Sequence, residues 1–391
     1  MTTPIKVFII AGEPSGDLLG GRLMAALRDN APPRGIEFAG VGGERMAAQG
    51  LASLFPMAEI ALFGVFEILP RLWRLRARVL ETVEAVLTAK PDALVTIDSP
   101  GFNQAVAKRV RARDPSIKLI HYVAPTVWAW KPGRAKKYAA LFDRLLALLP
   151  FEPPYFTREG LDCVFVGHSV IEGGAGKGDG AAFRARHAIP ADQPVVVLLP
   201  GSRRGEVSRL LPIYQETVAL LRRSHGDRVA LVIPTVPLVR DAVATAAALW
   251  DLPVVVVEGE QEKFDAFAAA TAALAASGTV SLELALARLP TVICYRLNPL
   301  TVALFRRFMR VRYANLVNLM LDRMSAPELL QEDCRPDLLH RELARLLDDP
   351  VARAAQIADV ATVASWLGEG EIPPSRRAAQ AVLDCVTKGT L

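Results

Sequence analysis

The sequence is poor in the residues that build disulfide frameworks and metal centres. Its four cysteines lie far apart and form no C-x-x-C pair, which argues against a zinc ribbon and favours a reducing compartment. The five histidines show no i, i+4 pairing, and no D-x-D motif occurs. We therefore expect neither a metal ion nor another cofactor. The missing G-x-S-x-G elbow argues against a serine hydrolase.

Long apolar runs are also missing. Arg, Asp or Pro interrupts every long candidate, so we expect no transmembrane helix. The N-terminal run VFIIAG is too short for a signal peptide and is soon followed by Glu13. Of the 391 residues, 51% are apolar and 22% charged, which excludes a disordered chain and leaves room for two or three domains. The net charge of +5 indicates a partner only where it is concentrated.

Apolar runs and helix-like segments alternate along the chain in two series. Parallel strands are predicted within residues 5–12, 36–43, 93–100, 117–125 and 143–151, and again within 195–207, 229–236, 254–260, 273–286 and 291–297. A glycine-rich stretch at residues 171–182 separates the two series and has the composition of an inter-domain linker or a surface loop. The pattern predicts an α/β protein of two Rossmann-like domains that face each other across a cleft.

Domain boundaries follow from this alternation. We place the first domain at residues 1–170 and the second at residues 171–348. The remaining residues, 349–391, are helical in period and include Trp366. Our hypothesis is that these last helices cross back to the first domain.

The turn AGEPSGD directly follows the first predicted strand. It places Glu13, Ser15 and Gly16 where the backbone N–H groups of a helix start can receive an anion or a sugar hydroxyl. A tight turn without any ligand explains the same residues equally well. The turn is neither G-x-G-x-x-G nor a Walker loop, which weakens the dehydrogenase and kinase interpretations.

Two further features of the first half carry candidate chemistry. Asp98 ends the run LVTID, and ligands of open α/β sheets bind at the carboxyl ends of strands. Its carboxylate is a candidate general base, with an N-cap of the next helix as the alternative. The run HYVAPTVWAWKPGRAKK contains Trp128 beside several cations. Such aromatic density favours a wall that faces a sugar or lipid, although a core tryptophan pair would also explain the aromatics.

Two turns of the second half combine into a candidate nucleotide-diphosphate site. In LLPGSRRGEV, an arginine in a glycine-opened turn can form a bidentate pair with phosphate. In ASGTVSLELA, small residues at a helix start allow a diphosphate to approach, and the carboxylate one turn later can bind ribose hydroxyls. An ordinary N-cap is the alternative for the second turn. The candidate residues are Ser202, Arg203, Ser277, Gly278, Thr279 and Glu283.

Apolar residues and arginines intermingle between residues 58 and 80. The arginines share a helix face beside a leucine strip, a pattern typical of a segment that lies in a membrane interface. An amphipathic helix packed on the core is the alternative. The candidate membrane or acyl-chain residues are Leu62, Phe63, Phe66, Leu69, Leu72, Trp73 and Leu75. A second cluster of Arg and Phe at residues 305–312 favours anionic lipid or phosphate, rather than nucleic acid, as the partner.

A series of motifs resembles, in order, that of the bacterial lipid-A-disaccharide synthases. The motifs are AGEPSGDLLG, FGVFEIL, IDSPGFN, HYVAPTVWAW, LPFEPPYF, FVGHSV, LLPGSRRGEV, ASGTVSLE and NLMLDRMSAPELLQEDC. They span residues 11 to 334, nearly the whole chain. HYVAPTVWAW and LPGSR-x-x-E-V are specific to that family, whereas SGT-x-x-x-E is shared among two-domain nucleotide-sugar glycosyltransferases.

The resemblance implies an inverting glycosyltransferase of the GT-B architecture. It would move 2,3-diacylglucosamine from UDP to 2,3-diacylglucosamine 1-phosphate and so form the β-1,6-linked lipid A disaccharide 1-phosphate and UDP. The first domain would take the acceptor, with Glu13, Ser15, Gly16 and Trp128 in its cleft. Asp98 matches the family's essential aspartate, either as base or as the residue that positions the acceptor.

The resemblance also implies roles in the second domain and a location. The UDP-binding residues would be Ser202, Arg203, Ser277, Gly278, Thr279 and Glu283, with Asn318 and Gln331 near the nucleotide sugar. The protein would be cytoplasmic and peripherally associated with the anionic inner membrane, without nucleic acid, and its oligomeric state stays open between monomer and homo-oligomer.

Three rival functions remain at this point. Another UDP-sugar glycosyltransferase, such as the muramyl-pentapeptide N-acetylglucosaminyltransferase, or a UDP-N-acetylglucosamine 2-epimerase would share the architecture, but HYVAPTVWAW argues against both. A non-catalytic nucleotide-sugar or lipid-binding protein would bind UDP without turnover. An NAD-dependent dehydrogenase would bind a nicotinamide cofactor.

Overall fold

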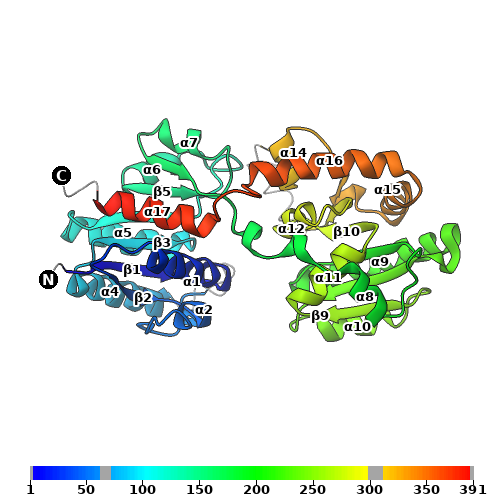
Figure 1. The fold of residues 1–391 in the computed structure, drawn as a ribbon, viewed down its shortest axis with the longest axis horizontal. Coiled ribbons are helices and arrows are strands. Elements are labelled where there is room, and N and C mark those ends of the chain that lie inside the picture. The colour runs from blue at the N-terminus through cyan, green and yellow to red at the C-terminus, as the bar shows by residue number, and fades with distance from the viewer. Residues whose placement is uncertain (1–2, 62–71, 298–310, 388–391) are drawn as a thin grey trace. The chain divides into compact units, whose positions relative to one another are not determined.

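Two α/β units make up the part of the chain that the computed structural model describes, residues 3–61, 72–297 and 311–387 (Figure 1). The first unit comprises Met1–Ser169 and Gly370–Leu391, and the second comprises Val170–Glu369. The chain therefore changes unit twice, and each unit is built on one parallel six-stranded sheet.

The sheet of the first unit has the strand order β2-β1-β3-β4-β5-β6, and all neighbouring pairs are parallel. The chain passes from β1 to β2 on one side and returns to β3 on the other, so the winding reverses between β1 and β3. Ligands of open α/β sheets bind at such a reversal, beyond the carboxyl ends of the strands. The strands are β1 (Ile5–Ala11), β2 (Ile36–Val41), β3 (Ala93–Ile97), β4 (Lys118–Tyr122), β5 (Arg144–Ala147) and β6 (Asp162–Phe165).

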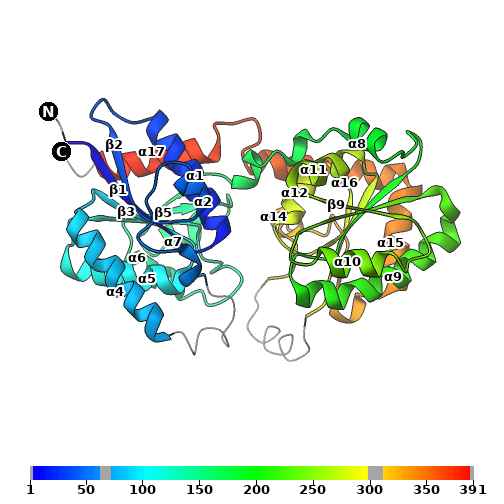
Figure 2. The same ribbon diagram turned by 90° about the horizontal axis from the view of Figure 1, so that it is seen from below.

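Helices cover both faces of this first sheet. Figure 2 shows α1 and α17 on one face and α4 and α5 on the other, and each face has its own apolar core. Arg144 in β5 donates to the carbonyl of Ala381 in α17 at 2.6 Å, so the last helix is part of this unit. The helices are α1 (Pro14–Asp29), α2 (Glu44–Ala47), α4 (Leu72–Ala89), α5 (Pro100–Arg113), α6 (Arg134–Ala139), α7 (Pro153–Thr157) and α17 (Pro374–Thr387).

The sheet of the second unit has the strand order β12-β11-β10-β7-β8-β9 and is also parallel throughout. Here the chain winds from β7 through β8 to β9 and then returns to β10 on the other side of β7. The reversal therefore lies between β7 and β10. The strands are β7 (Val195–Leu199), β8 (Ala230–Thr235), β9 (Val254–Glu258), β10 (Ala272–Ala276), β11 (Thr291–Tyr295) and β12 (Glu328–Leu330).

The helices of the second unit also form two layers. Residues of α9, α10 and α15 share one core with the sheet, while α8 packs on α11 and α12 on α16. The helices are α8 (Gly180–Arg186), α9 (Arg204–His225), α10 (Arg240–Ala247), α11 (Glu260–Ala269), α12 (Val280–Leu286), α14 (Leu316–Leu321), α15 (Pro336–Asp348) and α16 (Pro350–Trp366).

The pattern of apolar runs misses two strands, β6 and β12. Both are edge strands with a single neighbour, and they contain four and three residues. A short edge strand offers few unpaired backbone groups to other chains. Runs this short show no readable periodicity, so only the sheet itself reveals them.

The glycine-rich stretch at residues 171–182, predicted as an inter-domain linker or a surface loop, begins directly after the boundary of the two units between Ser169 and Val170, continues into α8 and packs against α11. A Cβ at Gly180 would lie 2.5 Å from the carbonyl oxygen of Ala268, and one at Gly178 would overlap the carbonyl of Phe264. These glycines permit a close backbone approach, so their role is packing.

Within residues 3–61, 72–297 and 311–387, no helix combines the length and the apolarity needed to cross a membrane. The same residues contain no group of three or more His, Cys, Asp or Glu side chains that could hold a metal ion. All four cysteines are free thiols, and three of them are buried.

Candidate functional site

A pocket of about 370 Å³ opens in the second unit at the carboxyl ends of β7, β8 and β10. It lies at the reversal of this sheet, where the loops after β7 and β10 diverge. The structure brings together in this pocket all six residues predicted from the two turns, namely Ser202, Arg203, Ser277, Gly278, Thr279 and Glu283.

Glu206 organises the loop after β7. Its Oε1 accepts hydrogen bonds from the hydroxyl of Tyr295 at 2.9 Å and from Nη1 of Arg203 at 3.1 Å. Burial, followed by the bond to Glu206, raises the pKa of Tyr295 to about 12, so the hydroxyl keeps its proton and remains a donor. The Arg203 side chain is 72% exposed, which leaves most of its N–H groups open to a ligand. Gly201 has φ +109°, and a Cβ there would come within 2.6 Å of Glu206 Oε2.

Lys263 of α11 binds the carboxylate of Glu283 of α12. Its Nζ lies 3.1 Å from Oε1 and 2.9 Å from Oε2, so one ammonium group holds both oxygens. The two side chains are 25% and 21% exposed and both line the pocket. Glu283 is therefore a partly buried carboxylate with a fixed orientation.

The turn Ser277–Thr279 connects β10 to α12 and borders the open space of the pocket. Gly278 has φ +155°, and nothing lies within 4 Å of the position that a Cβ would take. The hydroxyl of Ser281 donates to the Gly278 carbonyl at 2.8 Å and holds the turn. At the end of β8, the buried hydroxyl of Thr235 has no hydrogen-bond partner among the described residues.

Asn318 and Gln331 do not line this pocket. The buried amide of Asn318 accepts hydrogen bonds from two backbone N–H groups and donates to the carbonyl of Ala326 and the carboxylate of Glu328. It thereby fastens the loop before β12, which is a structural role. Gln331 accepts a hydrogen bond from the backbone N–H of Leu297 at 3.1 Å. Position along the chain does not show which way an amide points. Here the Asn318 amide points into the protein, whereas Gln331 is half-buried and binds the backbone of Leu297.

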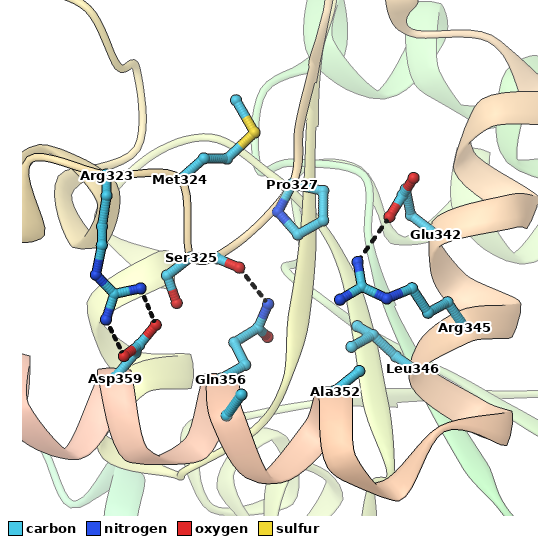
Figure 3. A pocket seen from close by; sticks show the side chains of 11 residues that line it. Arg323, Met324, Ser325, Pro327, Glu342, Arg345, Leu346, Ala352, Gln356 and Asp359 are labelled. Atoms are coloured by element: carbon cyan, nitrogen blue, oxygen red, sulfur yellow. Dashed lines mark hydrogen bonds and ion pairs between the residues drawn. The ribbon is translucent and has the colours of Figure 1, made fainter.

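A second pocket of the same unit, about 170 Å³ in volume, lies at the opposite ends of the strands, next to the start of β12 (Figure 3). Its charges are paired: Arg323 donates to Asp359 at 2.7 Å, and Arg345 lies 3.5 Å from Glu342. The amide of Gln356 reaches from α16 to the loop before β12. The polar groups that line this pocket bind one another and thereby connect α15, α16 and the loop before β12. The pocket is therefore part of the packing of these elements.

Asp98 and Ser99 join β3 to α5 at the reversal of the first sheet. Their φ angles are +47° and +40°, a left-handed conformation that is uncommon for residues other than glycine. Asn103 holds the turn by donating to the carbonyls of Ile97 at 3.0 Å and Asp98 at 2.7 Å. Burial raises the pKa of the Asp98 carboxyl, against a smaller opposing effect of the Ser99 backbone N–H. The turn thus holds a half-buried carboxylate of increased basicity.

The turn after β1 lies beside Asp98 because β1 pairs with β3. A Cβ at Gly12 would overlap the hydroxyl of Ser99, so only glycine allows the two turns to meet. Glu13 is the N-cap residue of α1, and Ser15 is exposed in its first turn. Gly16 is buried, and a Cβ there would make ordinary contacts with the side chains of Ala11 and Ile97 at 3.5 and 3.6 Å.

Trp128 is held by a buried carboxylate. Its Nε1 donates to Oε1 of Glu152 at 3.2 Å, and its ring packs edge-on against Phe151 with centroids 5.4 Å apart. The other oxygen, Oε2, accepts the backbone N–H groups of Leu148 and Leu149 at 3.1 and 3.0 Å. The half-buried tryptophan is therefore an anchored part of the loop that follows β4.

His121, from the same aromatic run, belongs to the core. Burial, reinforced by nearby Arg134, lowers its pKa to about 3, so the ring is neutral. Its Nδ1 lies 2.8 Å from the hydroxyl of Thr96, and its ring packs against Tyr138 at 5.1 Å. The aromatic wall predicted from this run does not include His121.

We expect the ionisation of Glu152 to make the first unit less stable as the pH rises. Burial raises its pKa from 4.5 to about 7, so the folded protein binds this proton more tightly than the unfolded chain. The resulting stability is complete below about pH 4.5 and is lost as the pH rises through about 7, a change on the order of 3 kcal/mol. Denaturant unfolding of the wild type and of Glu152→Gln, which cannot titrate, measures it. Relative to the variant, the wild type should be more stable at about pH 5 than at about pH 8. An equal difference at both pH values would contradict this prediction.

Of the segment between residues 58 and 80, which was predicted to lie in a membrane interface, the structure describes residues 58–61 and 72–80. Leu62, Phe63, Phe66 and Leu69 lie outside the described residues, as do the side chain of Leu72 and most of the cluster at residues 305–312. Trp73 is 67% exposed and carries the guanidinium of Arg74 over its ring at 5.1 Å. Leu75 instead packs against the core of the first unit, so it does not belong to an outward apolar strip.

Sequence reasoning missed two charged residues that line the larger pocket, Glu206 and Lys263. Glu206 stands three residues after Arg203 at the start of α9, a spacing that places the two side chains together and was readable. Lys263 belongs to another helix and precedes Glu283 by twenty residues. No local pattern pairs those two, so only the folded chain shows the contact.

Comparisons with known proteins agree over nearly the whole chain. The family profile described as Lipid-A-disaccharide synthetase matches residues 7–382. A lipid-A-disaccharide synthase from Rhodospirillum centenum is 59% identical over 385 residues, which cover 98% of this chain and 96% of that protein.

Solved structures show the same architecture at low identity. A UDP-GlcNAc 2-epimerase from Neisseria meningitidis, bound to UDP-GlcNAc, has a TM-score of 0.64 at 11% identity, covering 98% of this chain and 100% of that one. MurG from Acinetobacter baumannii has a TM-score of 0.57 at 14% identity, with the same coverage. Identities this low show the fold alone. The shared architecture of these solved structures confirms the predicted class of two Rossmann-like units of the GT-B type.

Proposed function

Because the chain belongs to the lipid-A-disaccharide synthase family, we propose that its two units divide the work of one glycosyl transfer. The protein is a glycosyltransferase. It condenses UDP-2,3-diacylglucosamine with 2,3-diacylglucosamine 1-phosphate to the β-1,6-linked disaccharide 1-phosphate and UDP. The observation that carries this proposal is the convergence of Arg203, the turn Ser277–Thr279 and Glu283 in a single pocket of the second unit.

That pocket binds the UDP part of the donor. The exposed guanidinium of Arg203 and the backbone N–H groups of the turn Ser277–Thr279 face the diphosphate, and Glu283 accepts the ribose hydroxyls. As the sugar leaves, negative charge grows on the diphosphate. Groups already oriented towards that charge stabilise it more in the transition state than in the ground state, which accelerates the reaction.

The first unit holds and activates the acceptor. Asp98 takes the proton of the acceptor 6-hydroxyl, whose oxygen attacks the anomeric carbon as the bond from that carbon to the UDP oxygen breaks. Its burial supports this role, because a raised pKa makes a carboxylate a better base. Glu13 and Ser15 at the adjoining turn and the anchored Trp128 border the acceptor.

The test is a product assay. With the two diacyl substrates and a chelator present, we expect disaccharide 1-phosphate and UDP to appear in equal amounts. UDP release without disaccharide, or interconversion of the UDP-sugar as in an epimerase, would overturn the proposal.

We further propose that the start of α4 contacts the inner membrane and admits the acyl chains. Trp73 is exposed beside arginines, and amphipathic aromatic rings with nearby cations suit the interface of anionic lipids. The undescribed apolar residues Leu62, Phe63, Phe66 and Leu69 precede it in sequence.

We expect Trp73→Ser to lower the recovery of the protein on anionic vesicles several-fold. The reason is the loss of an exposed aromatic ring from the contacting surface. Co-sedimentation with phosphatidylglycerol vesicles measures the effect. Trp366→Ser is the matched control, since this ring is 44% exposed on the second unit. Equal recovery of the Trp73 variant and the wild type would contradict the membrane role of α4.

A further inference from the structure

Lys263 is the one cation among the lining residues of the larger pocket that no motif explains. It sits in the first half of α11, whereas the residues assigned to UDP follow β7 and β10. Its ammonium group binds both carboxylate oxygens of Glu283, at 3.1 and 2.9 Å. A two-oxygen contact restrains rotation of the carboxylate about its last bond, which a single contact would leave free.

The lysine itself is held in place. Its Nζ stands 4.7 Å from the ring centroid of Phe264, and that phenylalanine is only 4% exposed. Cation–π contact with a buried ring and the bond to Glu283 together fix the ammonium position. Helix α11 in turn packs against α8 and the segment before it, where Gly178 and Gly180 permit close backbone approach.

The contact between Lys263 and Glu283 also affects the charge balance of the pocket. Four ionisable side chains carry charge there, Arg203 and Lys263 as cations and Glu206 and Glu283 as anions. The two pairs balance, because Arg203 binds Glu206 and Lys263 binds Glu283. Without Lys263 the pocket would carry one uncompensated negative charge, which repels a diphosphate.

We propose that Lys263 is a positioning residue for nucleotide recognition: it orients Glu283 so that the carboxylate meets the ribose hydroxyls and neutralises it beside the diphosphate. This inference rests on the proposed function of the pocket. Lys263 acts through Glu283 and does not touch the reacting atoms. Its loss should therefore weaken binding of the donor in the ground and transition states alike, and so raise KM without lowering kcat.

The experiment compares Lys263→Met, Lys263→Arg and Glu283→Gln by steady-state kinetics and by calorimetric titration with UDP and 2′-deoxy-UDP. We expect Lys263→Met to raise the donor KM about tenfold with kcat nearly unchanged, as expected for the loss of one charge-assisted contact. The wild type should prefer UDP to the deoxy analogue, and Lys263→Met should lose this preference to the same extent as Glu283→Gln. Lys263→Arg should retain it, and the double variant Lys263→Met/Glu283→Gln should lose no more than Glu283→Gln alone.

Arg240→Met is the matched control. Arg240 lies 3.3 Å from Glu258 in an ion pair of the same unit that does not line the pocket, so its loss should change neither KM nor the ribose preference. Thermal unfolding verifies that each variant is folded, and Lys263→Gln replaces Lys263→Met if the latter is not.

The outcomes distinguish a failure of the proposed function of the pocket from a failure of the positioning role of Lys263. If Glu283→Gln keeps the preference for UDP, the assignment of Glu283 to the ribose is wrong and the proposed function of the pocket must be revised. If Glu283→Gln loses the preference but Lys263→Met retains it, or if the Lys263 variant lowers kcat alone, the positioning role of Lys263 is overturned.

Discussion

Asp98→Asn should lower kcat about a thousandfold and leave UDP binding unchanged, the scale expected when a general base is removed. Asparagine has the same shape but cannot accept the acceptor proton. The UDP pocket lies in the second unit and Asp98 in the first, so the Kd for UDP should stay at the wild-type value. Steady-state rates with both diacyl substrates and calorimetric titration with UDP measure the two quantities.

The pH profile provides a second readout for Asp98. Because burial raises its pKa, the acid limb of kcat/KM should lie at higher pH than for an ordinary aspartate. Activity should rise through this limb as the carboxylate ionises. The control is Asp114→Asn, at a partly exposed aspartate at the end of α5, which should keep full activity. A kcat of the Asp98 variant within a few-fold of the wild type would remove Asp98 from the chemical step.

Arg203→Met should reduce kcat by about 10² to 10³ and raise the donor KM, an effect comparable to the loss of one transition-state donor. Arg203 has a largely exposed guanidinium, tethered at one nitrogen by Glu206, and we assign its other N–H groups to the leaving diphosphate. Arg203→Lys should recover part of the activity, because lysine retains the charge but not the planar fork. Steady-state kinetics with varied UDP-sugar measures both changes.

The neighbouring arginine provides the control. Arg204 is exposed at the first position of α9 and does not line the pocket, so Arg204→Met should leave kcat and KM unchanged. Equal losses in both variants would indicate general electrostatic attraction of the anionic donor rather than a specific phosphate contact.

Local sequence patterns predicted some site residues but not the contacts that individual amides and carboxylates make. Arg203 and Glu283 could be predicted as pocket residues, because strand ends and turn chemistry are local features. The direction of the Asn318 side chain could not be predicted, because its four hydrogen bonds are made to residues 325–328, further along the chain. The contacts of Glu152 and Leu75 could not be predicted either. Glu152 binds Trp128 of an earlier loop, and the Leu75 side chain packs against the core.

The strand order is the main feature of the fold that local patterns leave open. Ten apolar runs locate most strands, but nothing in them states that β1 pairs with both β2 and β3, or β7 with both β8 and β10. Those pairings place the turn of Gly12 beside Asp98, and the loop of Arg203 beside the turn Ser277–Thr279.

The amino-acid sequence by itself determined the fold class, the family and the turns that carry the chemistry, because apolar period and turn composition are set by residues near one another in the chain. Only the tertiary structure decided which turns meet, that α17 packs in the first unit, and that Lys263 holds Glu283. These contacts join residues far apart in sequence, and their geometry follows from how whole strands and helices pack.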